Sequence, residues 1–250
     1  MTDAVATPTP AAAEAPPAAP TDAVDSFGIA LPADWVRFPL DGTDFEEFVR
    51  LQRKRLSEVG ELSKTAQRQL ELMLRQVRND CTRDNVSLAA ILAVPLDPDS
   101  PTGEPGATPG TNLSLLSATC TIAVMTQGSL GTDLPLTVNT LAAAMGRQPE
   151  VGDDGVEIAN LDPPERIASP AGPAVKLVRL HTFPPQPETM RRLSVFAQHL
   201  LVPYDDGRRA AVVTFSTPNV DYAKPLSELF DEIGATFRMF GGDDATDPLA

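Results

Sequence analysis

Four side chains in the sequence are of the types that bind zinc: Cys81, Cys120, His181 and His199. Zinc sites take three or four such ligands, typically in pairs roughly two to five residues apart. The separations here are 39, 61 and 18 residues, which match no such pair. We therefore predict no metal site and no cofactor, although His181 and His199 can lie on neighbouring strands. Two thiols are too few for a disulfide framework, so we expect both to be buried and free.

A serine hydrolase would need a nucleophile beside a base that a third group orients. The sequence has no Gly-x-Ser-x-Gly elbow, but Ser216 ends a predicted strand and can approach His199. The glycine-rich residues 128–131 lack the Lys-Ser/Thr of a P-loop, and the acidic pairs at 153–154 and 205–206 lie in turns beside glycines. We predict no catalytic residues and no enzyme. The alternative is a small-molecule-binding protein or a hydrolase with a pocket near His199 and Ser216.

A basic segment lies between Arg50 and Arg83, where nine of the 20 Lys and Arg residues fall. Three of its members share one side of the predicted helix: Arg50, Arg53 and Lys54. Arg53 and Lys54 lie three and four residues after Arg50, which is the spacing of one helical face. We predict that this face binds an acidic partner protein, or the acidic N-terminal residues of its own chain. Glu46 and Glu71, each four residues before an arginine, favour the alternative that the face only carries solvated ion pairs.

Hydrophobic periodicity predicts the elements that must position these side chains. Apolar residues at three- and four-residue steps predict helices over 43–59, 63–81, 133–146 and 225–237. A Thr43-x-x-Glu46 capping box begins the first helix, and Asp133 is the expected cap of the third. Short apolar or β-branched runs predict six strands, over 86–94, 113–126, 156–161, 174–183, 193–202 and 210–216. Residues 27–40 add two short strands, and Asp206-Gly207 closes the last two long strands into an antiparallel hairpin.

These elements predict an α+β fold, in which helices pack on an antiparallel sheet of about six strands. A doubly wound α/β fold would need helices that alternate regularly with strands. No helical period appears between residues 156 and 216, which disfavours it.

Two segments of the sequence resemble a known family. The first, at 29–35, contains Leu31-Pro32-Ala33-Asp34-Trp35, and the second comprises a strand at 212–218 followed by a helix at 229–238. They resemble the opening and the close of the PsbP-like fold, which is shared by Ran-binding Mog proteins and LpqN-like lipoproteins. They also resemble the ends of a group of uncharacterised actinobacterial proteins. The resemblance implies an α-β-α sandwich with a non-catalytic binding or assembly role, and it carries over no functional residue.

Composition divides the chain into a body and two tails. Residues 1–26 are almost wholly Ala, Pro, Thr and Asp, which predicts a disordered acidic tail. Residues 27–240 form the predicted single domain, with an exposed Pro/Gly-rich loop at 95–110, and residues 241–250 form a second acidic tail. The tails carry −4 and −3, which is half of the net charge of −14. Because the body is also acidic, nucleic-acid binding is disfavoured.

No apolar stretch exceeds seven or eight residues, whereas a membrane span needs about 20, so we expect no membrane insertion. The first 26 residues lack the basic start and apolar centre of a secretory signal, which predicts a cytoplasmic protein. The sequence therefore predicts a non-enzymatic adaptor that binds an unidentified protein through Arg50, Arg53 and Lys54. Its oligomeric state is left open.

Overall fold

The computed structural model describes residues 24–40, 45–59, 86–96, 114–131, 133–147, 155–185 and 192–241, with single residues or short runs between 67 and 81. The predicted Thr43 cap, most of the N-terminal tail, most of the 95–110 loop and most of the C-terminal tail lie outside these residues. Within the described part of the chain, no helix is both long and apolar enough to cross a bilayer.

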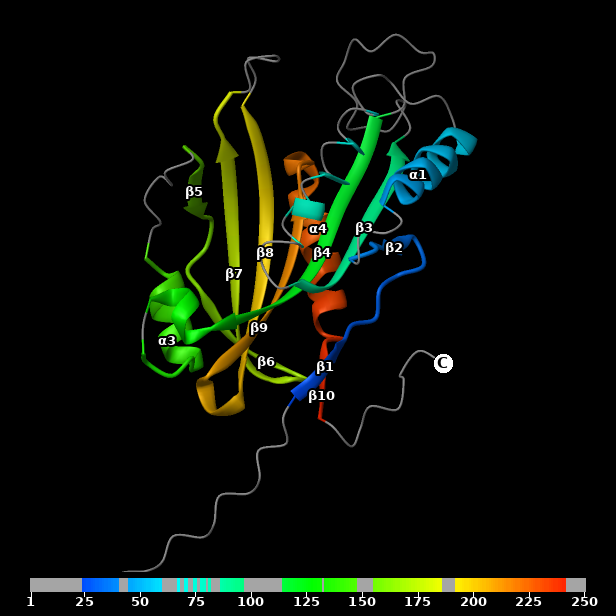
Figure 1. Cartoon of the computed structure of the whole chain (residues 1–250). Helices are drawn as coiled ribbons and strands as arrows, with labels where there is room; N and C mark the ends of the chain where they lie inside the picture. The colour runs from blue at the N-terminus through cyan, green and yellow to red at the C-terminus, as the bar shows by residue number, and fades with distance from the viewer. Residues whose placement is uncertain are drawn as a thin grey trace, which may run out of the picture.

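Eight antiparallel strands form the main sheet (Figure 1). In spatial order they are β2 (Trp35–Arg37), β3 (Val86–Leu96), β4 (Ser114–Thr126), β9 (Arg209–Thr217), β8 (Leu193–Tyr204), β7 (Gly172–Phe183) and β5 (Glu157–Asn160), while β6 (Glu165–Ser169) pairs with the first half of β7. A separate two-stranded ribbon joins β1 (Val24–Gly28) to β10 (Arg238–Gly241). The fold is therefore α+β and antiparallel as predicted, but the predicted count of about six strands is too low.

Helices cover both faces of the sheet. The helix α4 (Ala223–Gly234) lies on one face, and α1 (Phe45–Val59) and α3 (Val138–Met145) lie on the other (Figure 1). Described helical residues between 67 and 81 include Leu70 and Leu74, which are buried together with α1. Short 3₁₀ segments occur at Gln127–Leu130, Asp205–Gly207 and Val220–Tyr222.

The largest apolar cluster lies between the sheet and α4. Strands present alternate residues to each face, so every second side chain of β3, β4, β8 and β9 points toward this helix. Phe230 of α4 stacks on Phe215 of β9, with 4.9 Å between ring centroids. Trp35 and Cys120 are buried in the same cluster, as expected, and burial raises the pKa of the Cys120 thiol.

The opposite face carries two smaller apolar clusters. One packs α1 and the helical residues near 70–77 against β2, β3 and the start of β4. The other packs α3 against the ends of β7, β8 and β9, with Leu141, Leu177 and Leu201 buried at its centre. Polar side chains occupy the sheet between the two clusters, so this face is not covered by one continuous core.

Several predicted boundaries are wrong, each for a local reason. The third helix is capped by Thr137 and not by Asp133, because Thr137 and Thr140 form a reciprocal capping box just after Pro135. The strand β1 begins at Val24, within the last residues of the predicted tail, and pairs with β10.

Two further boundaries differ from the prediction, because one helix is shorter and one strand is longer than expected. The closing helix stops at Gly234 instead of 237, and the chain enters β10 at Arg238. The predicted loop at 95–110 begins two residues later, because Pro95 still pairs with Leu115 of β4.

The predicted hairpin between β8 and β9 is confirmed. Its register runs to the Tyr204 and Arg209 pair, and the turn contains Asp205, Asp206 and Gly207, all with positive φ. The carbonyl of Gly207 accepts a hydrogen bond from the backbone N–H of Leu136, which anchors the turn. A Cβ at Gly207 would lie 3.0 Å from Pro135, so both the conformation and the space require glycine.

Candidate functional site

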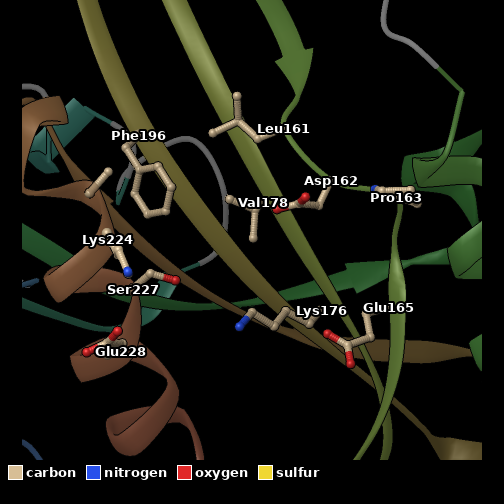
Figure 2. Close-up of a pocket in the computed structure, with 11 residues that line it drawn as sticks. Leu161, Asp162, Pro163, Glu165, Lys176, Val178, Phe196, Lys224, Ser227 and Glu228 are labelled. Carbon is tan, nitrogen blue, oxygen red and sulfur yellow. The ribbon is translucent and has the colours of Figure 1, made fainter.

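A groove of about 610 Å³ runs beside α4, where the sheet ends in β5 and β6 (Figure 2). We call it the α4 groove. Its lining residues come from the β5–β6 connection, β6, β7, β8 and α4: Leu161, Asp162, Pro163, Glu165, Lys176, Val178, Phe196, Ala223, Lys224, Ser227 and Glu228. Figure 2 shows α4 on one side of the groove and the β5–β6 connection on the other, with β7 and β8 between them.

The groove exists because the edge of the sheet is interrupted. Both β5 and β6 pair with β7, but they meet different halves of it, and residues 161–164 bridge the gap. Two prolines, Pro163 and Pro164, lack backbone N–H groups and so cannot continue the ladder. The N–H of Leu161 still donates to the carbonyl of Val178, which holds the connection against β7 and leaves the Leu161 side chain 48% exposed.

The floor of the groove is apolar. Alternation along β7 and β8 points Val178 and Phe196 toward α4, and both are buried. Lys176 occupies the next position of β7 on the same face, and its amino group extends toward α4 (Figure 2).

Four hydrogen-bonded side chains join the sheet to α4 beneath the groove. The ammonium group of Lys176 lies 2.6 Å from the carboxylate of Asp231. The amide of Gln198 donates to the same carboxylate at 2.8 Å, and the Ser227 hydroxyl donates to the Gln198 carbonyl at 2.7 Å. Because Gln198 is only 4% exposed, its hydrogen bonds are shielded from water and fix the position of α4 over the sheet.

The rim of the groove is charged on both sides. Asp162 and Glu165 lie on the β5–β6 side, and Lys224 and Glu228 lie on the α4 side. Within the described residues, these four side chains form no ion pair with one another or with any other group. Since Asp231 neutralises Lys176, the groove has three unpaired carboxylates and one unpaired ammonium.

Among the described residues that line the groove, Ser227 carries the one hydroxyl group, and it donates its hydrogen bond to an amide carbonyl instead of a base. None of these residues is among the candidate site residues predicted from the sequence. A signal was present in Lys176, a charged residue at an inward-facing position of β7 between Ala174 and Val178.

The histidines that the sequence analysis singled out lie on the opposite face of the sheet. His181 of β7 and His199 of β8 are on neighbouring strands, as expected, with 6.3 Å between ring centroids. The small side chain of Ala197 lies between them, opposite Arg179 in the register. The Nε2 atoms of both rings are buried without a hydrogen-bond partner.

Both imidazoles have lowered pKa values. Burial lowers the pKa of His199 to about 3, and the positive charge of Arg179 and the neighbouring His181 add to the effect. The His199 side chain keeps part of its surface exposed, but its Nε2 is buried, and that atom sets the cost of protonation. Burial and Arg179 also lower the pKa of His181. Both rings are therefore neutral at pH 7.

Ser216 and His199 do not form a nucleophile and base pair. The register places Thr214 opposite His199, and their side chains lie 3.0 Å apart from Nδ1 to Oγ1. Ser216 instead shares a hydrogen bond of 2.6 Å with Thr119 on β4. No group of three or more His, Cys, Asp or Glu side chains suited to a metal occurs in the part of the chain that the structure describes.

The basic face predicted for binding lies on the exposed side of α1. Arg50 pairs with Glu47 at 3.1 Å, and not with Glu46 as the spacing suggested. Arg53 pairs with Glu71 at 2.6 Å, and Glu71 also holds Arg75 as predicted. Lys54 is exposed beside them and also has an interaction partner. Much of the positive charge of this face is therefore neutralised by neighbouring carboxylates.

The similarity of this chain to known proteins is distant. No protein-family model matches the sequence, and no curated protein matches it. Among solved structures, the chain is similar to LpqN, which is involved in cell envelope biogenesis of Mycobacterium tuberculosis. That match covers 86% of this chain and 83% of the other, with 9% sequence identity and a TM-score of 0.39. A similarity this distant supports no conclusion about function.

Proposed function

We propose that this protein is a non-enzymatic binding protein that holds a segment of a partner protein in the α4 groove. The observation that carries the proposal is the combination of an apolar floor, a charged rim and an exposed leucine at one edge. Binding surfaces on proteins commonly have an apolar centre and a polar rim. The PsbP-like architecture and the cytoplasmic location remain predictions from the sequence.

The groove is better suited to a protein segment than to a small molecule. Pockets for small ligands bury most of the ligand surface, whereas this groove is open along one side. Leu161 is 48% exposed at its edge, and a partner that covered this side chain would gain apolar burial without any rearrangement of the sheet.

The alternative functions start from other surfaces. A hydrolase or small-molecule pocket at His199 and Ser216 would have to use the face opposite the groove, where each of these side chains already pairs with a threonine. Binding through Arg50, Arg53 and Lys54 would first require a partner to compete with Glu47 and Glu71. The α4 groove has neither obstacle.

Site-specific crosslinking in cells tests the proposal. A photoreactive amino acid at Leu161 of the full-length protein should give a discrete adduct with another protein. The same amino acid at Leu134, which is 61% exposed away from the groove, serves as the matched control. A third position, Arg50, reports on the basic face. Adducts from Leu161 that are absent at Leu134 support the proposal, whereas no adduct at Leu161, or an adduct at Arg50 alone, overturns it.

A further inference from the structure

The charges of the α4 groove are unbalanced in one direction. Of its two ammonium groups, that of Lys176 is held at 2.6 Å by Asp231, outside the groove lining. The second, Lys224, shares the groove with three carboxylates that have no ion-pair partner among the described residues: Asp162, Glu165 and Glu228. The free groups of the groove thus carry a net negative charge.

These carboxylates flank the floor from both sides. Glu228 projects from α4, whereas Asp162 and Glu165 project from the β5–β6 side (Figure 2). Between them, Val178 and Phe196 form an apolar floor with a low dielectric constant. Charges beside such a surface interact more strongly with an incoming ion than charges that water surrounds fully.

The apolar lining of the groove sets a second requirement for the molecule that binds there. A purely polar cation bound there would leave the exposed side chain of Leu161 without an apolar contact. An occupant that carries both a positive charge and an apolar side chain matches the rim and the floor together.

We propose that the partner segment held in the α4 groove is cationic, with Lys or Arg side chains directed at Asp162, Glu165 and Glu228 and an apolar side chain directed at Leu161, beside the apolar floor. This inference rests on the proposed function, since it names the chemistry of the segment that the groove receives. It also predicts that the partner differs in charge from the acidic partner expected for the basic face of α1.

Peptide binding by fluorescence anisotropy tests this chemistry on the full-length protein. The probe is a labelled six-residue peptide of alternating Lys and Leu. A Glu and Leu peptide inverts its charge, a Lys and Ser peptide removes its apolar side chains, and spermine serves as a competitor without a peptide chain. We expect the Lys and Leu peptide to bind best, and its affinity to fall with salt, because exposed charges are screened.

Two triple variants separate the groove from the overall acidity of the chain. The first carries Asp162→Asn, Glu165→Gln and Glu228→Gln. The matched control makes the same change in net charge on the exposed side chains of another surface, with Asp34→Asn, Glu46→Gln and Glu47→Gln. The groove variant should weaken binding about tenfold, because it removes three exposed charge interactions with the peptide. The control should change it less than about twofold.

Each outcome of these binding measurements either supports or overturns the inference. Equal weakening by both triple variants would show attraction to net charge only, and would overturn the inference. Tighter binding of the Glu and Leu peptide would overturn it as well, as would equal binding of spermine or of the Lys and Ser peptide. The substituted side chains are exposed, so both variants should fold, which circular dichroism checks. A crosslink at Leu161 to an acidic segment would refute the cationic chemistry while leaving the groove as the binding surface.

Discussion

The two faces of the main sheet use polar side chains in different ways. On the α4 face, a buried network from Lys176 to Ser227 supports a groove whose rim charges stay unpaired. On the opposite face, hydroxyls and imidazoles pair with each other across neighbouring strands, as Thr119 does with Ser216 and Thr214 with His199. On the α4 face, the rim charges remain available for a partner. On the opposite face, most polar side chains are hydrogen-bonded within the sheet.

This difference shows why residue type is a poor guide to the site in this protein. Histidine and serine are common catalytic side chains, yet here His199 and Ser216 form hydrogen bonds to threonines on neighbouring strands. The α4 groove is built from Lys, Glu, Leu and Phe, which carry no chemical signature in the sequence. Four measurements test the difference between the two faces.

The largest effect is expected for Phe230→Ala. This side chain is fully buried and stacks on Phe215, so its loss should lower the free energy of unfolding by about 3–5 kcal/mol. Denaturant unfolding measures the change, and Leu134→Ala, at an exposed position, should cost less than about 0.5 kcal/mol. A loss below about 1 kcal/mol for Phe230→Ala would mean that α4 does not depend on this contact, and the groove would lose its support.

The next largest effect is the loss of stability at acid pH that is expected from His199, on the face of the sheet opposite α4. His199 has a pKa of about 3 in the folded protein and about 6.5 when unfolded, so the unfolded state takes up the proton first. The stability this group contributes is complete above pH 6.5 and is lost as the pH falls toward 3. Each pH unit across this window is worth up to about 1.4 kcal/mol.

The variant His199→Gln measures that contribution. Between pH 7 and pH 5, where carboxylates stay largely ionised, the stability of the wild type should fall more steeply than that of the variant. His181→Gln should reduce the slope in the same direction, because its pKa is also lowered. Parallel pH profiles for the wild type and His199→Gln would show that the ring is hydrated and charged in the folded state.

A moderate effect is expected for Gln198→Leu. The substitution keeps much of the volume but leaves the Ser227 hydroxyl without its acceptor and Asp231 without one donor. We expect a loss of about 1–2 kcal/mol in the free energy of unfolding. Thr214→Val removes one hydrogen bond on the other face and should cost less, so the reverse order of the two variants would contradict the contrast between the faces.

The smallest effect is expected for Arg53→Ala. Its ion pair with Glu71 lies at the surface, where such pairs contribute about 0–1 kcal/mol and weaken with salt. Unfolding at low and high salt measures the difference from the wild type. A loss well above 1 kcal/mol would mean that the basic face has a structural role that its exposure does not suggest.

Much of the fold was predictable, because periodicity is a local property. The six predicted strands all occur, and the Asp206-Gly207 turn closes the hairpin where it was expected. The missed elements are short: β6 has five residues and β10 has four, too few for a period to show. Such strands form because a longer neighbour, β7 or β1, offers them a hydrogen-bonding edge.

The candidate site was not predictable in the same way. The sequence allowed His181 and His199 to lie on neighbouring strands but could not decide their partners. The register pairs His199 with Thr214 and Ala197 with Ser216, and a shift of two residues would have placed Ser216 opposite His199. Nor could a sequence pattern reveal that Leu161, Lys176 and Glu228 line one groove, since they are 15 and 52 residues apart.

Most of the strands and helices, the acidic balance of the chain and the apolar stripe of α4 follow from the sequence alone. These depend on neighbours within a few residues, whose propensities and spacing act before any distant contact forms. Which charges are neutralised and which stay free depends instead on the tertiary structure. Strand order and helix docking bring Asp231 to Lys176 and leave Asp162, Glu165 and Glu228 around an apolar floor. The energy of a charge depends on what lies within a few ångströms of it in space.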